Sequence, residues 1–160
     1  MSKYKVKNVF IVTDEPFPIG LAATNRIISI SKGLIENNIS VKVICIRTTE
    51  TKENGIVNKE PSGNYNGIEF EYSCGTTTRG NTFIKRRWLF WKGVIKAFLE
   101  LKNSEPNDIL MLYLSQPLFM ILFYIGAKIF GLLYVQDKSE YPFVLHNTSL
   151  IGRTYAKIYT

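Results

Sequence analysis

The chain has 160 residues, of which 46% are hydrophobic and 21% are charged. This length suits one ordinary domain, and this share of hydrophobic residues excludes a wholly disordered chain because it is enough to build a core. The 20 Lys and Arg residues outnumber the 13 Asp and Glu residues, and the net charge of +7 favours an anionic partner: nucleic acid, an acidic membrane surface or a phosphorylated ligand. Two cysteines, Cys45 and Cys74, are too few for a disulfide framework and fit a reducing compartment.

The N-terminal third of the chain predicts a strand, a helix and a second strand. Asn8–Thr13 is apolar and β-branched, which is typical of a parallel strand covered on both faces. Apolar residues recur every three or four positions over Ala23–Leu34, which predicts a helix that ends at Asn37 and Asn38. Ser40–Arg47 predicts the second strand. Together the three elements predict a right-handed crossover unit of a parallel sheet.

The rest of the chain continues this alternation. Thr48–Asn66 is polar and predicts a long loop, and Gly67–Ser73 alternates as a strand near the sheet edge does. Thr82 is predicted to cap a helix that runs to about Ser104. One face of that helix is apolar and carries Ile84, Trp88, Trp91, Ile95 and Phe98. The later predicted elements are a strand at Asp108–Leu114, a helix at Leu118–Phe130 stopped by Gly131, a strand at Leu132–Gln136, a loop at Asp137–Phe143 and a helix from about Leu150.

Alternating strands and helices predict an α/β fold: a Rossmann-like, doubly wound and mainly parallel sheet in a single domain. Such a sheet binds its ligands at the carboxyl ends of the strands. The segments expected at that edge are Asp14–Gly20, the residues from Thr48 onward, Cys74–Gly80, Ser115–Pro117 and Asp137–Phe143.

The loop after the first strand is not a dinucleotide fingerprint. Such a fingerprint needs G-x-G-x-x-G and an acidic residue at the end of the second strand. This loop has only Gly20, and the second strand ends in Arg47. Two interpretations of Gly20 stay open: it lets a phosphate or sugar approach the start of the following helix, or it closes a turn begun by Pro16 and Pro18.

The sequence gives little support for a metal site or for a catalytic serine nucleophile. His146 is the sole histidine, so a multi-histidine metal site is excluded and no structural metal is expected. No G-x-S-x-G elbow accompanies it to place a serine nucleophile. Glu140 is suited to bind sugar hydroxyls or act as a base, and a solvated loop carboxylate is the alternative interpretation.

Two segments raise the question of a membrane. Residues Ile109–Ala127 carry no charge, but the polar and helix-disfavouring residues at 115–117 favour a buried strand, a loop and a helix over a membrane span. Lys85, Lys92 and Lys96 share one helix face and predict either contact with an anionic membrane surface or a solvated amphipathic helix. No nucleic-acid-binding motif accompanies the positive charge, so nucleic acid is not expected as a partner.

Three segments in chain order carry a resemblance to a known family. The first is PFPIGLAATNRIISISKGLIENNISVKVICI, where a Pro-x-Gly loop precedes Ala22, Thr24 and Arg26. The second is GTTTRGNTFIKRR, residues Gly75–Arg87, and the third is YVQDKSEYPF, residues Tyr134–Phe143. In this order they resemble the N-terminal, acceptor-side domain of the family-4 glycosyltransferases of the GT-B type, which have two Rossmann domains and move a sugar from a nucleotide donor.

The resemblance implies a role in polysaccharide biosynthesis. In the family the N-terminal domain holds the acceptor, and its first loop faces the donor diphosphate across a cleft. It implies that Pro18 and Gly20 line that cleft, with Arg26 and Glu140 as further substrate-binding candidates and no catalytic residue assigned. The substrates implied are a nucleotide sugar and an acceptor glycan or lipid-linked glycan, without a separate cofactor. The location implied is cytoplasmic, including the inner face of the membrane.

Members of this family continue into a second Rossmann domain, which binds the sugar nucleotide. Residues 1–160 contain no counterpart of that donor-binding domain, so the expectation is an N-terminal domain truncated within its last helix and inactive alone. Two other classes of function stay open. One is a free-standing Rossmann-type module that binds a nucleotide or small ligand, and the other is a membrane-associated interaction protein.

Overall fold

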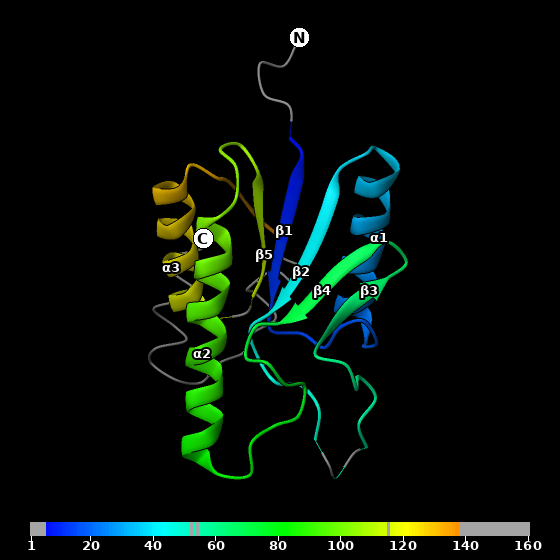
Figure 1. Cartoon of the computed structure of the whole chain (residues 1–160), viewed down its shortest axis with the longest axis vertical. Coiled ribbons are helices and arrows are strands. Elements are labelled where there is room, and N and C mark those ends of the chain that lie inside the picture. Colours follow the sequence, from blue (N-terminus) through cyan, green and yellow to red (C-terminus); the bar gives the residue numbers. More distant parts are fainter. Residues whose placement is uncertain (1–5, 52, 54, 115, 138–160) are drawn as a thin grey trace, which may run out of the picture.

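The computed structural model describes residues 6–51, 53, 55–114 and 116–137. The strands are β1 (Asn8–Thr13), β2 (Ser40–Cys45), β3 (Ser62–Tyr65), β4 (Ile68–Tyr72), β5 (Ile109–Tyr113) and β6 (Leu133–Gln136), and the helices are α1 (Ala22–Glu36), α2 (Phe83–Lys102) and α3 (Pro117–Phe130). They form a single α/β domain around one sheet of order β3-β4-β2-β1-β5-β6 (Figure 1). All neighbouring strands are parallel except β3 and β4. The predicted α/β class, Rossmann-like and mainly parallel, is confirmed.

Strand β3 corrects the sequence prediction. The whole of Thr48–Asn66 was expected to be a loop because it is polar, but Ser62–Tyr65 pairs with β4 as an antiparallel hairpin. Asn66 and Gly67 make the two-residue turn, with φ of 53° and 85°. Asn-Gly is the preferred pair for such a turn because both positions need a positive φ. A short polar strand is tolerated here because β3 forms the edge of the sheet.

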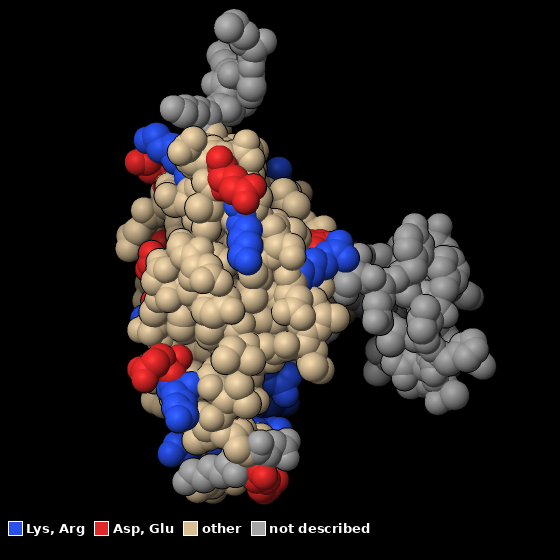
Figure 2. All heavy atoms as spheres, turned by 90° about the vertical axis from the view of Figure 1, so that its right-hand side faces the viewer, with Lys and Arg blue, Asp and Glu red and all other residues tan. Residues whose placement is uncertain are grey.

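The two faces of the sheet are covered by different helices. Helix α1 lies on one face, and α2 and α3 lie side by side on the other (Figure 1). Each face has its own apolar core, centred on residues such as Ile11 and Val43 under α1 and Leu110 and Leu112 under the other two helices. Figure 2 shows the side of α1 and β3, where charged groups of both signs are scattered and neither sign gathers into one patch.

Three helix ends follow their sequence signals. Asn38 has a φ of 58° just beyond α1, although Asn37 keeps a negative φ. The Thr82 hydroxyl accepts a hydrogen bond from the Lys85 N–H at the start of α2. Gly131 takes the left-handed conformation that ends α3, with a φ of 73°. These three predictions are confirmed.

Helix α2 meets the sheet through its small residues. The buried positions include Gly93 and Ala97, and a Cβ at Gly93 would overlap the backbone oxygen of Ile46 in the sheet. This close approach turns the large apolar residues away, so Ile84 and Trp88 are 80% and 60% exposed. The apolar stripe recognised in the sequence is therefore the outer face of α2, except for Phe98, which stacks on Phe123 of α3 and packs against the core.

The uncharged segment Ile109–Ala127 divides between β5 and α3. None of the helices in the described part of the chain combines the length and the apolarity that crossing a bilayer requires. Cys45 and Cys74 are both buried as free thiols, and burial raises the pKa of each.

Candidate functional site

The carboxyl ends of the parallel strands meet at one edge of the sheet, toward which the arrowheads in Figure 1 point. Beyond β1 the chain crosses to β2 on one side, whereas β5 lies on the other side of β1. The order of strands therefore reverses between β1 and β5. Doubly wound sheets bind ligands at this switch point, so the candidate site lies among the loops that follow these strands.

The loop after β1 is held by side chains from two other elements. The buried Tyr72 hydroxyl, at the end of β4, accepts a hydrogen bond from the Phe17 N–H and lies 3.0 Å from the Phe17 carbonyl oxygen. The buried Asn58 amide pairs with both backbone groups of Ile19 at 2.9 Å, and its nitrogen also donates to Glu50 at 2.7 Å. Because these buried groups satisfy one another, the loop has a fixed shape before any ligand binds.

Gly20 lies where the loop turns into α1. A Cβ at this position would overlap the hydroxyl of Thr24, which donates a 2.6 Å hydrogen bond to the Pro16 carbonyl oxygen. The space beside Gly20 is thus filled by the chain's own threonine. This geometry accounts for a glycine as the residue that lets the turn close, and the Phe17–Pro18 peptide bond within the turn is cis.

A carboxylate stands at the start of the same loop. Burial, followed by the negative charge of Asp14, raises the pKa of Glu15, and the positive charge of Arg47 partly opposes this rise. Arg47 follows β2, so two neighbouring strands bring groups of opposite charge near the switch point.

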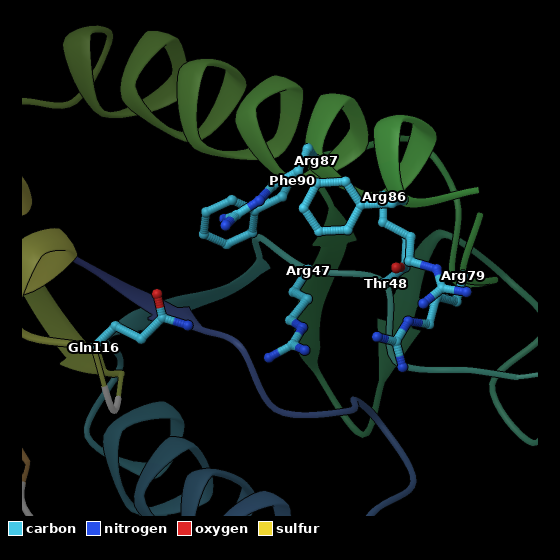
Figure 3. Close-up of a pocket in the computed structure, with 8 residues that line it drawn as sticks. Arg47, Thr48, Arg79, Arg86, Arg87, Phe90 and Gln116 are labelled. Carbon is cyan, nitrogen blue, oxygen red and sulfur yellow. The ribbon is translucent and has the colours of Figure 1, made fainter. Parts of the chain in front are cut away.

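An arginine-lined pocket of about 200 Å³ opens beside the segments that follow β2 and β4 (Figure 3). We call it the arginine pocket. Its lining comes from the loop after β2, the loop after β4, the first two turns of α2 and the cap of α3: Arg47, Thr48, Arg79, Phe83, Arg86, Arg87, Phe90 and Gln116. Figure 3 shows Arg47 reaching into the space beside α2, with Arg79 and Arg86 on one side and Gln116 on the other.

Local hydrogen bonds set the positions of these arginines. The segment after β2 pairs with the segment after β4 through a parallel bridge between Glu50 and Thr78, and the Arg79 N–H donates to the Glu50 carbonyl oxygen at 2.8 Å. The Arg86 Nε donates to the Gly80 carbonyl oxygen at 2.9 Å. The Arg87 guanidinium lies over the Phe83 ring, 5.5 Å from its centroid.

None of the four arginines is within ion-pair distance of an acidic side chain that the structure describes. Guanidinium groups recognise phosphate and carboxylate through paired hydrogen bonds. Four of them around one cavity therefore have the chemistry to hold a multiply charged anion. The sequence did not reveal this site, because its arginines come from three separate segments and only Arg86 and Arg87 are adjacent.

The residues proposed from the sequence lie in different places. Pro18 and Gly20 belong to the fixed loop, but Pro18 lines a second, shallow hollow beside Tyr65 on the β3 side. Arg26 of α1 binds Asp137, just after β6, through two contacts of 2.8 and 2.9 Å, so its charge is already paired. Glu140 lies outside the described residues.

His146 and the predicted helix from Leu150 also lie outside them. No cluster of potential metal-ligating side chains occurs among residues 6–137 as far as the structure describes them.

The three lysines of α2 have contacts within the protein. Lys96 forms an ion pair with Glu71 of β4. Lys92 lies 5.5 Å from the centroid of the Trp88 ring, and Lys85 covers Gly80. The basic face of α2 is therefore partly used to hold the helix against the loop after β4.

A second charged cluster lies between α2 and the sheet. Lys42 of β2 contacts Glu69, Glu71 and Glu100 at 3.3–3.4 Å. Burial alone would raise the pKa of Glu71, but hydrogen bonds with Glu100 and Lys96 and the charges of both lysines lower it to about 2. Burial and the hydrogen bond with Glu71 raise the pKa of Glu100. This cluster is internally paired and lies away from the switch point.

Comparison of the chain with protein-family models, with curated proteins and with solved structures gives no match in any of the three. What the chain does must therefore be argued from its own geometry.

Proposed function

We propose that the chain is the acceptor-side domain of a glycosyltransferase that takes its sugar from a nucleotide donor. The acceptor would lie along the carboxyl edge of the sheet. The loop from Glu15 to Gly20 would form one wall of a cleft, and a donor-binding domain would face it.

One observation carries the proposal: the described parts of the three sequence segments that resemble the family-4 glycosyltransferases lie at or next to this edge. The first supplies the loop after β1, and the second, Gly75–Arg87, supplies three of the pocket arginines. The third begins on β6, and its Asp137 pairs with Arg26 of the first, 111 positions away in the chain. Open α/β sheets bind their ligands outside the carboxyl ends of the strands, which is where these parts lie.

The chemistry of the edge suits a substrate that carries phosphate. Arginines that form no ion pair with a described acidic side chain attract an anion, and the side chain of Gln116 adds a polar group on the opposite side of the pocket. The charge of Arg47 acts on the Glu15 carboxylate, whose pKa is raised by burial, and in this proposal Glu15 would contact a sugar hydroxyl of the substrate.

The proposal is tested by measuring sugar transfer in membranes of the source cells. Membranes from cells that lack the gene, and from cells complemented with the natural gene, are supplied with radiolabelled nucleotide sugars. We expect deletion to remove one labelled glycan and complementation to restore it. An unchanged set of labelled products in the deletion strain would contradict the proposal.

Two variants give this assay a matched comparison. Gly20→Ala places a methyl group against Thr24 and disturbs the loop, whereas Gly33→Ala adds the same group on α1 where nothing lies within 4 Å. Gly20→Ala is expected to restore the product poorly and Gly33→Ala fully. The isolated 160 residues are expected to transfer no sugar by themselves.

A second candidate is a Rossmann-type module that binds a free nucleotide, since the arginine pocket could also hold nucleotide phosphates. Calorimetry of the chain with UDP, GDP and ADP, combined with the gene-deletion assay, distinguishes this module from the glycosyltransferase domain. Tight binding of one nucleotide, together with unchanged glycan products in the deletion strain, would favour the module.

A further inference from the structure

The side of the domain formed by α2 and α3 is apolar where it faces away from the sheet. We call this side the outer apolar face. It consists of five residues of α2 and four of α3, each more than 40% exposed: Ile84, Trp88, Trp91, Ile95, Leu99, Leu118, Ile121, Ile125 and Ile129. The two helices lie side by side on the same face of the sheet, so their exposed residues form one surface (Figure 1).

The helices are held in place by other residues. Helix α2 packs inward through Gly93 and Ala97, and α3 packs inward through Gly126 and Ala127. A Cβ at Gly126 would overlap the Phe98 ring of α2, so the two helices already meet closely below the surface. The small inward residues, rather than the nine outer ones, therefore bring the helices against the sheet and against each other.

The size of the outer apolar face matches that of a protein interface. Large side chains that are about half exposed each leave on the order of 100 Å² in water, so the nine together expose on the order of 1,000 Å². The largest apolar patch on a typical monomer covers about 300–600 Å². Each partner in a standard protein–protein interface buries about 800 Å². The outer apolar face is thus larger than an ordinary monomer surface tolerates and large enough for a stable dimer.

The lysines of α2 contact the domain itself and leave the outer apolar face uncharged. Lys96 forms an ion pair with Glu71 of β4. The Lys92 Nζ lies 3.3 Å from where a Cβ on Gly75 would stand, and Lys85 covers the same loop after β4. These side chains therefore lie along the flank of α2 that faces β4 and its loop.

This distribution of charge favours a second copy of the chain as the partner. Lys102 is the last residue of α2 and lies at the end of the stripe, beyond Leu99. Like charges at the centre of a contact between two copies would oppose association, and none of the nine residues is charged. An anionic bilayer, in contrast, attracts a helix whose basic residues are free beside its apolar face. The apolar surface is present here without that free charge.

The spacing of the nine residues suits packing between helices. On α2, Ile84, Trp88, Trp91 and Ile95 recur at intervals of four and three, and the α3 residues recur in the same way. Helices pack through such stripes, whose side chains form ridges that fit into the grooves of a partner. Trp88 and Trp91 are 60% and 46% exposed, and tryptophan is enriched among the residues that dominate interface energies.

We infer that two copies of the chain associate through the outer apolar face, with α2 and α3 of one copy packed against α2 and α3 of the other. A two-fold contact uses the same surface on both copies, so a broad apolar surface with no charge at its centre complements itself. The inference rests on this surface alone and holds whatever the arginine pocket binds.

The tryptophans provide a direct test. The chain has two, Trp88 and Trp91, and both lie on the outer apolar face. Sedimentation velocity from about 0.1 to 100 µM is expected to show a change from the 18.3 kDa chain to a particle of twice that mass, with a dissociation constant of about 10 µM or lower. Over the same range tryptophan emission should move to shorter wavelength, and quenching by acrylamide should fall by roughly half as the indole rings become buried.

Two pairs of substitutions locate the contact. Trp88→Ser with Ile95→Ser should raise the dissociation constant about 100-fold, because it removes two anchors from the centre of the α2 stripe. Leu21→Ser with Val57→Ser is the matched control: both side chains are exposed and apolar, at 83% and 55%, but lie outside α2 and α3. The control pair should leave the dissociation constant unchanged. Thermal melts that match the natural chain verify the folding of each variant.

Several results would overturn the inference. A chain that stays monomeric up to 100 µM, on the order of ten times the expected dissociation constant, refutes it. A dimer whose tryptophan quenching matches that of the monomer, or one that survives loss of Trp88 and Ile95, associates through another surface. A shift of tryptophan emission on adding phosphatidylglycerol vesicles, without self-association, would make a lipid bilayer the partner instead. None of these results bears on the glycan lost in the deletion strain.

Discussion

Tyr72 shows how a single buried side chain can fix the shape of the loop after β1. Its hydroxyl bonds to backbone atoms of Phe17 and lies 3.0 Å from the hydroxyl of Thr49, so it links the loops after β1 and β2. A backbone N–H buried without a partner is costly, which is why this hydroxyl matters beyond its own bond.

Tyr72→Phe is expected to lower the free energy of unfolding by about 1–3 kcal/mol, because the buried Phe17 N–H loses its acceptor. Urea unfolding measures the change. Tyr65→Phe is the matched control, since the Tyr65 hydroxyl has no hydrogen bond within the described residues, and it should change stability by less than about 0.5 kcal/mol. Equal effects of the two substitutions would contradict the role given to Tyr72.

The lowered pKa of Glu71 predicts that the folded protein loses stability in acid. Its pKa is lowered from an ordinary value of 4.5 to about 2. Between these two values the unfolded chain binds more protons at this residue than the folded protein does, so its contribution to stability is present above pH 4.5 and is lost as the pH falls toward 2. Glu100, whose pKa is raised, acts in the opposite direction as the pH rises through its own range.

Glu71→Gln should therefore make stability depend less on pH between about 4.5 and 2. Urea unfolding at several pH values in this window measures the slope. Glu36→Gln at the exposed end of α1 is the control and should keep the natural slope. An unchanged slope in Glu71→Gln would show that another group dominates acid unfolding.

At the scale of elements, the contact between α2 and the sheet depends on one glycine. Gly93→Ala would push a methyl group into the backbone at Ile46 and should destabilise the fold by about 1–3 kcal/mol. Gly33→Ala adds the same group to α1 in open space and should stabilise by about 0.5–1 kcal/mol through helix propensity. Thermal melting of the two variants should shift in opposite directions, and a shift in the same direction would disprove the close approach.

The sequence predicts most elements of this fold but not all of their contacts. Periodicity and capping signals locate β1, β2, β4, β5, β6 and all three helices, because each signal is local. Strand β3 was missed because its residues are polar, although its Asn66–Gly67 turn carried a recognisable hairpin signal. The apolar stripe of α2 could not be assigned to core or surface, since Gly93 decides which side meets the sheet.

The candidate site, too, could be predicted from the sequence only in part. The position of the Glu15–Gly20 loop at the carboxyl edge follows from strand order, which the alternation of elements predicts. The clustering of Arg47, Arg79 and Arg86 does not, because only the folded sheet brings the loops after β2 and β4 together. The pairing of Arg26 with Asp137 depends on the same long-range geometry.

For the whole molecule, charge and apolar surface are distributed unevenly. The face seen in Figure 2 mixes charges of both signs, whereas the outer apolar face gathers exposed apolar side chains of α2 and α3. Association of two copies through the outer apolar face should therefore persist as salt is raised, because salt screens contacts between charges but not contacts between apolar groups. Sedimentation velocity over a range of salt concentrations measures this, and dissociation of the dimer at moderate salt would argue against an apolar interface.

The most direct test of the account is to locate where an anion binds. Inorganic pyrophosphate is titrated into the ¹⁵N-labelled chain, and the shifted backbone amide signals are mapped onto the fold. We predict shifts in the loop from Glu15 to Gly20 and around Arg47, Arg79 and Gln116, all at the carboxyl edge, and none near Lys7 at the opposite end of β1. Shifts confined to Lys85, Lys92 and Lys96, or the absence of any shift, would contradict the claim that this edge is the ligand-binding site.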